Sequence, residues 1–144
     1  MRENKGVAWY DIPGSGWPRD VWVLLHPVYT AWHLSYVVIG AALAPRLNWP
    51  VLGWTLLAFF LGMGIAAHCY DELHGRPLKT SIPAWVLTLV AGLAMMGAFT
   101  IGALVGLAQT WWILPCIAFG GFIALAYDLE WFKGSFHTDG WFAL

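Results

Sequence analysis

The chain contains 144 residues, 60% of them hydrophobic and 10% charged, and its mean hydropathy is +0.65. This composition excludes an ordinary soluble domain, and the formal net charge of −1 argues against a nucleic-acid-binding surface. Cys69 and Cys116 are isolated and form no Cys-x-x-Cys motif, so neither a disulfide framework nor a zinc ribbon is indicated.

Long apolar runs follow one another along the chain. Each is roughly 18–25 residues long, which is enough for a helix to cross a bilayer. The sequence therefore predicts an all-α, polytopic integral membrane helical bundle with four transmembrane helices in two antiparallel hairpins. An interfacial leader is expected over 1–20, with no apolar core of a cleavable signal peptide. A transmembrane domain is expected over 21–144, with helices at about 21–44, 50–74, 83–107 and 110–127.

Prolines and polar residues mark the expected helix boundaries. Pro27 either begins the embedded part of the first helix or kinks that helix. Asn48 with Pro50 predicts an N-cap and first turn for the second helix, and Ser81 with Pro83 predicts the same for the third.

Tryptophans and small residues also follow a membrane pattern. Small residues spaced four apart predict close helix packing, at Gly62/Ala66 and at Ala98/Gly102/Gly106. Indole rings anchor at membrane interfaces, and the following tryptophans fall near expected helix ends: Trp17, Trp22, Trp49, Trp85, Trp111, Trp112, Trp131 and Trp141.

The distribution of charge predicts the orientation. With four spans, Arg46 alone among the bases lies on one side, and all eight acidic residues share the other side with the remaining bases. The positive-inside rule then places both termini in the cytoplasm, with the chain in the plasma membrane. The bases expected on the cytoplasmic side are Arg2, Lys5, Arg19, Arg76, Lys79 and Lys133.

The stretch from Ala66 to Lys79 concentrates the polar chemistry. His68, Asp71 and Glu72 are three and four residues apart, so they share one face of a helix. Gly75 and Pro77 predict that this helix stops there. The C-terminal end of a helix carries partial negative charge, which disfavours carboxylates in the last turn. A nearby cation is therefore expected to balance their charge.

That cation is either a base or a bound metal. Carboxylates flanked by bases at a membrane surface suit a diphosphate held through Mg²⁺, which prefers oxygen ligands. The plainer interpretation is a solvated helix end, in which Asp71 and Glu72 pair with Arg76 and Lys79.

Three segments resemble the N-terminal half of the UbiA-type membrane prenyltransferases. His68-Cys69-Tyr70-Asp71-Glu72 stands where that family has its first Asp-rich motif, at the end of helix 2. Arg76-Pro77-Leu78 matches the Arg-Pro-Leu that follows the motif. The first helix is also similar, with His26-Pro27 near its start and a Gly-Ala-rich end at 39–44. Tyr127 and Lys133 match more loosely after helix 4.

The resemblance implies transfer of a prenyl group from an isoprenoid diphosphate to a lipophilic acceptor, or a non-catalytic relative of such an enzyme. Asp71 and Glu72 would be catalytic and, with His68, would bind Mg²⁺. The substrate would contact Arg76, Lys79, Tyr127 and Lys133. Of the family's three aspartates in this motif only Asp71 is kept, and the family has about nine helices where this chain has four.

Two other interpretations remain open at this point. His33 and His68 are candidates to ligate a chlorin or haem, which would make the chain an accessory subunit of a larger membrane complex. More simply, His33 makes only a hydrogen bond to a neighbouring helix. A transition-metal site, for Fe or Zn, is the other interpretation, with the ligand set His68, Asp71, Glu72, His74 and His137.

The last four residues, 141–144, resume an apolar pattern after a polar segment. Four residues cannot span a bilayer. The sequence therefore predicts either a fragment of a longer protein or a half that completes its core with other membrane subunits or a second copy.

Overall fold

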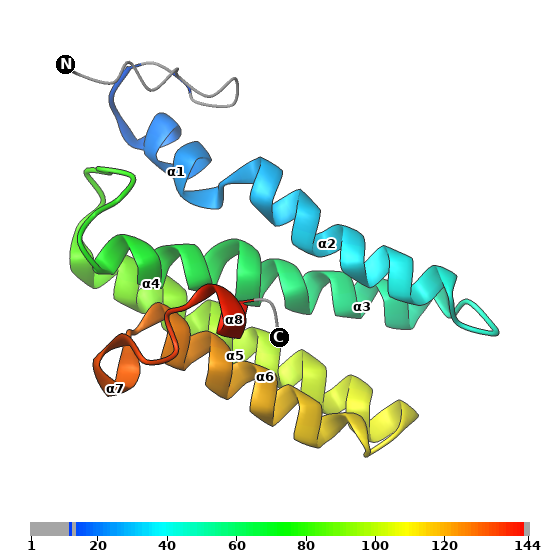
Figure 1. Cartoon of the computed structure of the whole chain (residues 1–144). Coiled ribbons are helices and arrows are strands. Elements are labelled where there is room, and N and C mark those ends of the chain that lie inside the picture. Colours follow the sequence, from blue (N-terminus) through cyan, green and yellow to red (C-terminus); the bar gives the residue numbers. More distant parts are fainter. Residues whose placement is uncertain (1–11, 13, 143–144) are drawn as a thin grey trace.

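The computed structural model describes residues 12 and 14–142, and within them every regular element is helical. The helices form an elongated bundle that is built around two antiparallel pairs, α2 with α3 and α5 with α6 (Figure 1). The elements are α1 (Trp17–Leu25), α2 (Pro27–Ala42), α3 (Trp49–Phe59), the π-helix η1 (Phe60–Ala67), α4 (His68–Leu73), α5 (Ala84–Gln109), α6 (Ile113–Asp128), α7 (Trp131–Gly134) and α8 (Asp139–Phe142).

Two helices are long and apolar enough to cross a membrane. One is the continuous rod Trp49–Leu73, made of α3, η1 and α4, with 25 residues; the other is α5, with 26. In the most apolar 18-residue window of each helix, only 17% of the first helix and 22% of the second are buried within the protein. The core helix of a soluble protein would be mostly covered, so this exposure favours a lipid environment. The apolar helix α6 is shorter than these two.

The two expected hairpins are present. In Figure 1, α2 runs antiparallel to α3, and α5 runs antiparallel to α6. The long helix α5 is central, because it packs against α3, η1, α4 and α6. Both hairpin tips lie at one end of the bundle, whereas α1, α7 and the loop after α4 lie at the other.

The first predicted helix, 21–44, is wrong as a single element. The chain breaks at His26, which takes a left-handed conformation with φ 43° and ψ 64°. Pro27 is the cause, because its ring disfavours the right-handed helical region for the preceding residue and it has no N–H to donate. The hydroxyl of Thr30 donates to the carbonyl of Leu25 (2.6 Å) and so satisfies an acceptor at the break.

The break also changes the expected leader. Helix α1 starts at Trp17, inside the predicted 1–20 segment, and Leu24 packs into the core beside Cys69, Leu87 and Ala91. The rest of the leader, residues 1–11 and 13, lies outside the described residues. Residues 143–144, at the end of the apolar segment 141–144, also lie outside the described residues. The first two residues of that segment belong to α8.

One of the two predicted caps is confirmed. The side chain of Asn48 accepts a hydrogen bond from the N–H of Val51 (3.2 Å), and Pro50 occupies the first turn of α3. The cap at Ser81 is wrong, since the N-cap of α5 is Pro83 and makes no side-chain bond. Ser81 is instead bonded to Asp20, 61 residues earlier.

Small residues let the helices approach as their spacing predicted. A Cβ on Gly62 would touch Ala98 at 3.6 Å, and one on Gly106 would come within 2.8 Å of Ile113. Tryptophans lie at both ends of the bundle: Trp49, Trp111 and Trp112 at the hairpin tips, and Trp17, Trp85 and Trp131 at the opposite end. All six are exposed, as expected of rings that anchor at two interfaces.

The α5–α6 contact yields a stability prediction. A methyl group on Gly121 would overlap the ring of Phe99, whereas one on Gly120 would meet nothing within 4 Å. We expect Gly121→Ala to destabilise the bundle by about 1–3 kcal/mol, the usual cost of overpacking. Gly120→Ala is the matched control and should be neutral or slightly stabilising. Thermal unfolding of both variants in detergent measures the difference, and equal midpoints would contradict the packing.

Candidate functional site

The polar chemistry gathers at the end of the bundle away from the hairpin tips. The π-helix η1 leads directly into it and ends at Ala67, just before His68. π-Helical turns are rare and often occur at functional sites. At Gly64 a Cβ would lie 2.9 Å from Thr30, so α2 passes unusually close to η1 here.

An imidazole–tyrosine cluster fills this crossing. The rings of His26 and His68 stack at 5.6 Å with an interplanar angle of 16°. Tyr29 lies between His68 and His33, with ring centroids 5.6 Å from the first and 4.4 Å from the second. These residues come from the helix break, from α2 and from the start of α4.

Two of these imidazoles are oriented by backbone carbonyls. Nδ1 of His33 donates to the carbonyl of Tyr29 (3.0 Å), and Nδ1 of His68 donates to that of Gly64 (3.1 Å). A carbonyl can only accept, so Nδ1 carries the proton in the neutral ring and Nε2 is left as the basic nitrogen. The bond of His33 to Tyr29 therefore lies within α2 and is not the predicted bond to a neighbouring helix.

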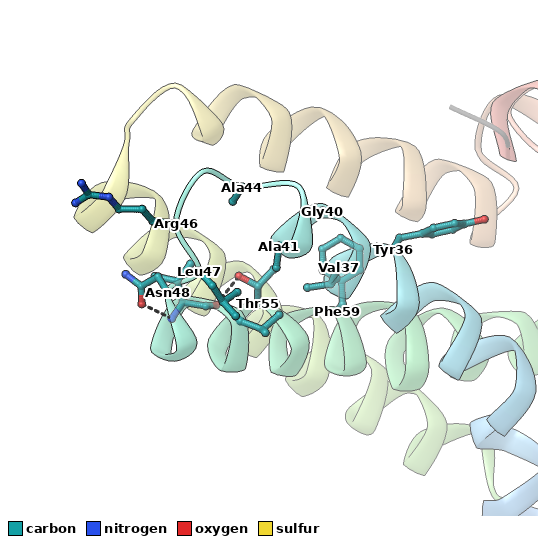
Figure 2. Close-up of a pocket in the computed structure, with 12 residues that line it drawn as sticks. Tyr36, Val37, Gly40, Ala41, Ala44, Arg46, Leu47, Asn48, Thr55 and Phe59 are labelled. Carbon is teal, nitrogen blue, oxygen red and sulfur yellow. Dashed lines mark hydrogen bonds between the residues drawn. The ribbon is translucent and has the colours of Figure 1, made fainter.

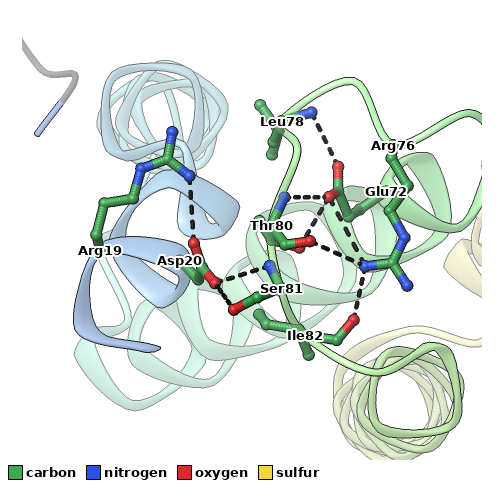
Figure 3. Close-up of polar contacts among 8 residues, drawn as sticks. All are labelled: Arg19, Asp20, Glu72, Arg76, Leu78, Thr80, Ser81 and Ile82. Carbon is green, nitrogen blue, oxygen red and sulfur yellow. Dashed lines mark hydrogen bonds and ion pairs between the residues drawn. The ribbon is translucent and has the colours of Figure 1, made fainter. Parts of the chain in front are cut away.

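Glu72 is committed to the loop that follows α4. Its carboxylate is 0% exposed and accepts bonds from the N–H of Leu78 (2.9 Å), the N–H of Thr80 (2.8 Å) and the hydroxyl of Thr80 (2.8 Å) (Figure 3). The Nη1 atom of Arg76 lies 4.0 Å from Oε1. Both oxygens are therefore engaged, and the structure gives Glu72 a structural role in place of the predicted catalytic and metal-binding one.

Arg76 belongs to the same loop structure. Its Nη1 donates to the carbonyls of Thr80 (3.3 Å) and Ile82 (2.6 Å), and its side chain is 37% exposed. Of the plainer interpretation, only the pairing of Glu72 with Arg76 is seen, and Glu72 is buried where a solvated helix end was expected. The other two predicted bases, Lys79 and Lys133, are exposed and have positive φ values of 54° and 62°.

A second buried carboxylate ties α1 to this loop. Asp20 is 3% exposed and accepts bonds from both the N–H and the hydroxyl of Ser81 (Figure 3). Arg19 lies 3.2 Å from the other carboxylate oxygen. The bonds from Ser81, and to a lesser degree Arg19, hold the pKa of Asp20 below its ordinary value despite the opposing effect of burial.

Asp71 has different neighbours from Glu72, although the two residues are adjacent in the chain. It is half-buried and lies within electrostatic range of Asp128 at the end of α6 and of His137 in the tail. The ring of His137 stacks on Tyr127 at 4.3 Å, and its Nδ1 donates to the Tyr127 carbonyl (3.1 Å). Residues at the ends of the two hairpins thus lie within electrostatic range of one another.

Asp128 is a site residue that the sequence reasoning missed. It is the first polar residue beyond the apolar part of α6 and is only 7% exposed. A signal was present in the sequence, because Tyr127-Asp128 closes the second hairpin much as Tyr70-Asp71 closes the first.

The transition-metal interpretation is wrong in its ligand set. Across residues 12 and 14–142, no three His, Cys, Asp or Glu side chains converge as a metal ion requires. Three of the five proposed ligands have other partners: His68 stacks on His26, Glu72 binds the loop, and Nδ1 of His74 bonds the Tyr70 carbonyl (3.2 Å).

An apolar groove of about 380 Å³ lies at the opposite end, between α2 and α3 (Figure 2). Asn48 and Thr55 contribute polar atoms to its wall, but both bond to Val51 in the same helix. The Arg46 side chain points away from it in Figure 2. None of the predicted site residues lines this groove.

Comparison with known proteins adds no assignment. No protein-family model, curated protein or solved structure matches the chain significantly. The UbiA-type relationship therefore stays a prediction based on the quoted motifs.

The loop contacts of Glu72 predict its effect on stability. Glu72→Gln replaces one buried carboxylate oxygen with an amide NH2 group, which cannot accept a hydrogen bond, and it removes the charge. We expect a loss of about 1.5–3 kcal/mol, the range for hydrogen bonds to charged groups. The control is Glu130→Gln, at an exposed acid, which should change stability by less than about 0.5 kcal/mol. Denaturant unfolding in detergent gives both values; a neutral Glu72→Gln would contradict the loop role.

Asp20 predicts a dependence on pH. Its pKa in the folded protein is lower than in the unfolded chain, so its stabilising effect is complete above the unfolded pKa, near 3.8, and is lost as the pH falls through the folded pKa. Asp20→Asn should therefore unfold at a lower temperature than the wild type at pH 6, with a gap that closes toward the acid limit. A gap that stays constant down to about pH 2–3, at least roughly one unit below the pKa of the unfolded chain, would contradict the assignment.

Proposed function

We propose that this chain is a UbiA-like membrane prenyltransferase or a non-catalytic relative, and that it binds an isoprenoid diphosphate at its polar end. The observation that supports this is that Asp71 lies within electrostatic range of Asp128 and of His137, whose ring stacks on Tyr127. These side chains come from the ends of both hairpins, and the helices beneath them are apolar. A headgroup and a long hydrocarbon chain need this combination of surfaces.

The proposed topology has four spans: α2, the rod from α3 to α4, α5 and α6. The loop after α4 and both termini then face the cytoplasm, and the two hairpin tips face the opposite side of the plasma membrane. The two tryptophan belts fit this arrangement, as does Arg46 as the base at the hairpin-tip end. The partners are bilayer lipid and the isoprenoid diphosphate.

The residues at the polar end have distinct proposed tasks. Asp71 provides a carboxylate ligand for Mg²⁺, and the bound ion would neutralise part of the negative charge of the diphosphate. Lys79 and Lys133 are exposed and supply positive charge to phosphate oxygens. Tyr127, held by its contact with His137, offers a phenol to the same headgroup. Arg76 fixes the loop that carries Lys79 and keeps part of its guanidinium exposed.

A second candidate function is a non-enzymatic accessory subunit that holds a chlorin or haem within a larger membrane complex. The orientation of His33 and His68 favours it, because both rings direct Nδ1 to a backbone carbonyl. This arrangement is typical of histidines that ligate metals. Tyr29 and Trp32, at 5.8 Å from each other, provide aromatic surface beside them.

The deciding experiment is titration of the detergent-solubilised protein with geranylgeranyl diphosphate, with and without Mg²⁺. We expect magnesium-dependent binding that Asp71→Asn abolishes, because an amide is a poor ligand for a hard cation. Glu130→Gln is the matched control at an exposed acid and should bind normally. Binding without magnesium dependence, or none at all, would reject the prenyltransferase-like proposal. A visible absorption band in the purified protein would then support the accessory subunit.

A further inference from the structure

The apolar groove between α2 and α3 is long and narrow (Figure 2). Its volume of about 380 Å³ is enough for a small ligand. Along α3 its wall runs from Val51 to Phe59, which is about 12 Å at the usual rise of an α-helix. Half of the hydrocarbon core of a bilayer is about 15 Å thick. The groove therefore starts at the hairpin tip and follows most of one leaflet.

Small residues of α2 keep this groove open. Gly40, Ala41 and Ala44 form part of its α2 side, and a Cβ on Gly40 would meet nothing within 4 Å. Gly62 and Gly106 differ, because side chains of a neighbouring helix fill the space beside them. An unfilled space loses the dispersion contacts of its walls. In a membrane, a hydrocarbon chain is therefore expected to enter the groove.

The mouth of the groove is polar and positively charged. Arg46 lies in the turn between α2 and α3, is exposed, and has no ion pair within residues 12 and 14–142. Figure 2 shows its guanidinium outside the groove, directed away from the apolar walls. Asn48 uses its amide oxygen to cap α3, which leaves its amide NH2 group to donate at the same mouth.

No acid among the described residues lies near this mouth. Those acids belong to α1, to α4, to the end of α6 and to the tail that follows it, and none of these segments forms a hairpin tip. A negatively charged group that approaches Arg46 would therefore meet no like charge from this part of the chain.

We propose that the groove binds an acyl chain of an anionic phospholipid, whose phosphate is held by Arg46. Guanidinium groups form charge-assisted hydrogen bonds with phosphate oxygens, often two at once. The exposed tryptophans Trp49, Trp111 and Trp112 at the same end are typical of the level of lipid headgroups. The apolar groove and the base at its mouth thus match the two parts of one lipid.

Two comparisons favour this occupant. A second groove, of about 450 Å³ between α3 and α5, has no base among its lining residues, so it gives no reason to select an anionic lipid. A helix of a second copy, about 10–12 Å wide with its side chains, needs a broader depression than the first groove offers. The lipid site goes beyond the proposed function, because it lies at the end of the bundle away from Asp71 and does not depend on diphosphate binding.

The test is native mass spectrometry of the detergent-solubilised full chain, titrated with dioleoyl phosphatidylglycerol or dioleoyl phosphatidylcholine. We expect one saturable site that prefers the anionic lipid. Arg46→Gln should weaken binding of phosphatidylglycerol by about tenfold, the lower end for loss of a hydrogen bond to a charged group, and so remove the preference. Arg46→Lys should stay within about threefold of the wild type, because lysine keeps the charge that attracts phosphate.

Filling the groove tests its acyl-chain part. Gly40→Phe should abolish the saturable site for both lipids, because the ring would occupy the open space. Gly53→Phe is the matched control: a Cβ there also meets nothing within 4 Å, but Gly53 does not line the groove. Circular dichroism checks that each variant is folded. If Gly40→Phe does not fold, Ala44→Phe on the same wall replaces it.

Several outcomes would overturn the proposal. These are equal binding of the two lipids by the wild type, an unchanged preference in Arg46→Gln, and equal loss of binding in Gly53→Phe. A dimer that dissociates in Gly40→Phe would assign the groove to a second copy of the chain instead of a lipid.

Discussion

The carboxylate of Glu72 organises the polar end of this protein. A fully buried charge is tolerable only when hydrogen bonds replace its lost hydration, and here the loop after α4 supplies them. Those bonds fix the loop at Leu78 and Thr80. Ser81 follows at once and binds Asp20, which fixes α1. One buried acid therefore sets the path from α4 to α5, and a second extends that order to the start of the chain.

The rest of the bundle depends on its surroundings more than on its own core. The buried apolar set is small, and several of its members are alanines: Leu24, Ala66, Ala67, Cys69, Leu87, Ala91, Ala94, Met95 and Ala126. Large apolar side chains such as Leu93, Met96, Leu104 and Leu107 are exposed along α5. In water this surface would drive aggregation. In lipid it costs nothing, and the helices associate through close contacts at small residues such as Gly62 and Gly106.

The sequence predicted the parts of the fold that depend on local chemistry. Apolar length located the helices, and Asn48 capped α3 as expected, because a cap involves residues three apart. The break at His26 depends on which backbone conformation that residue adopts before Pro27. The partner of Ser81 depends on a contact between residues 61 positions apart in the sequence. Asp128 was missed for the same reason, since its burial is a property of the folded chain and not of its neighbours in the sequence. The residue types near the site were visible, but their grouping was not.

Adjacent carboxylates on one helix take different tasks because of helix geometry. Successive residues on an α-helix are about 100° apart, so Asp71 and Glu72 can contact different parts of the protein. Glu72 bonds the loop, whereas Asp71 lies within electrostatic range of Asp128 at the end of α6. The chemistry of the polar end therefore depends on how the two hairpins are arranged as well as on a motif within one helix.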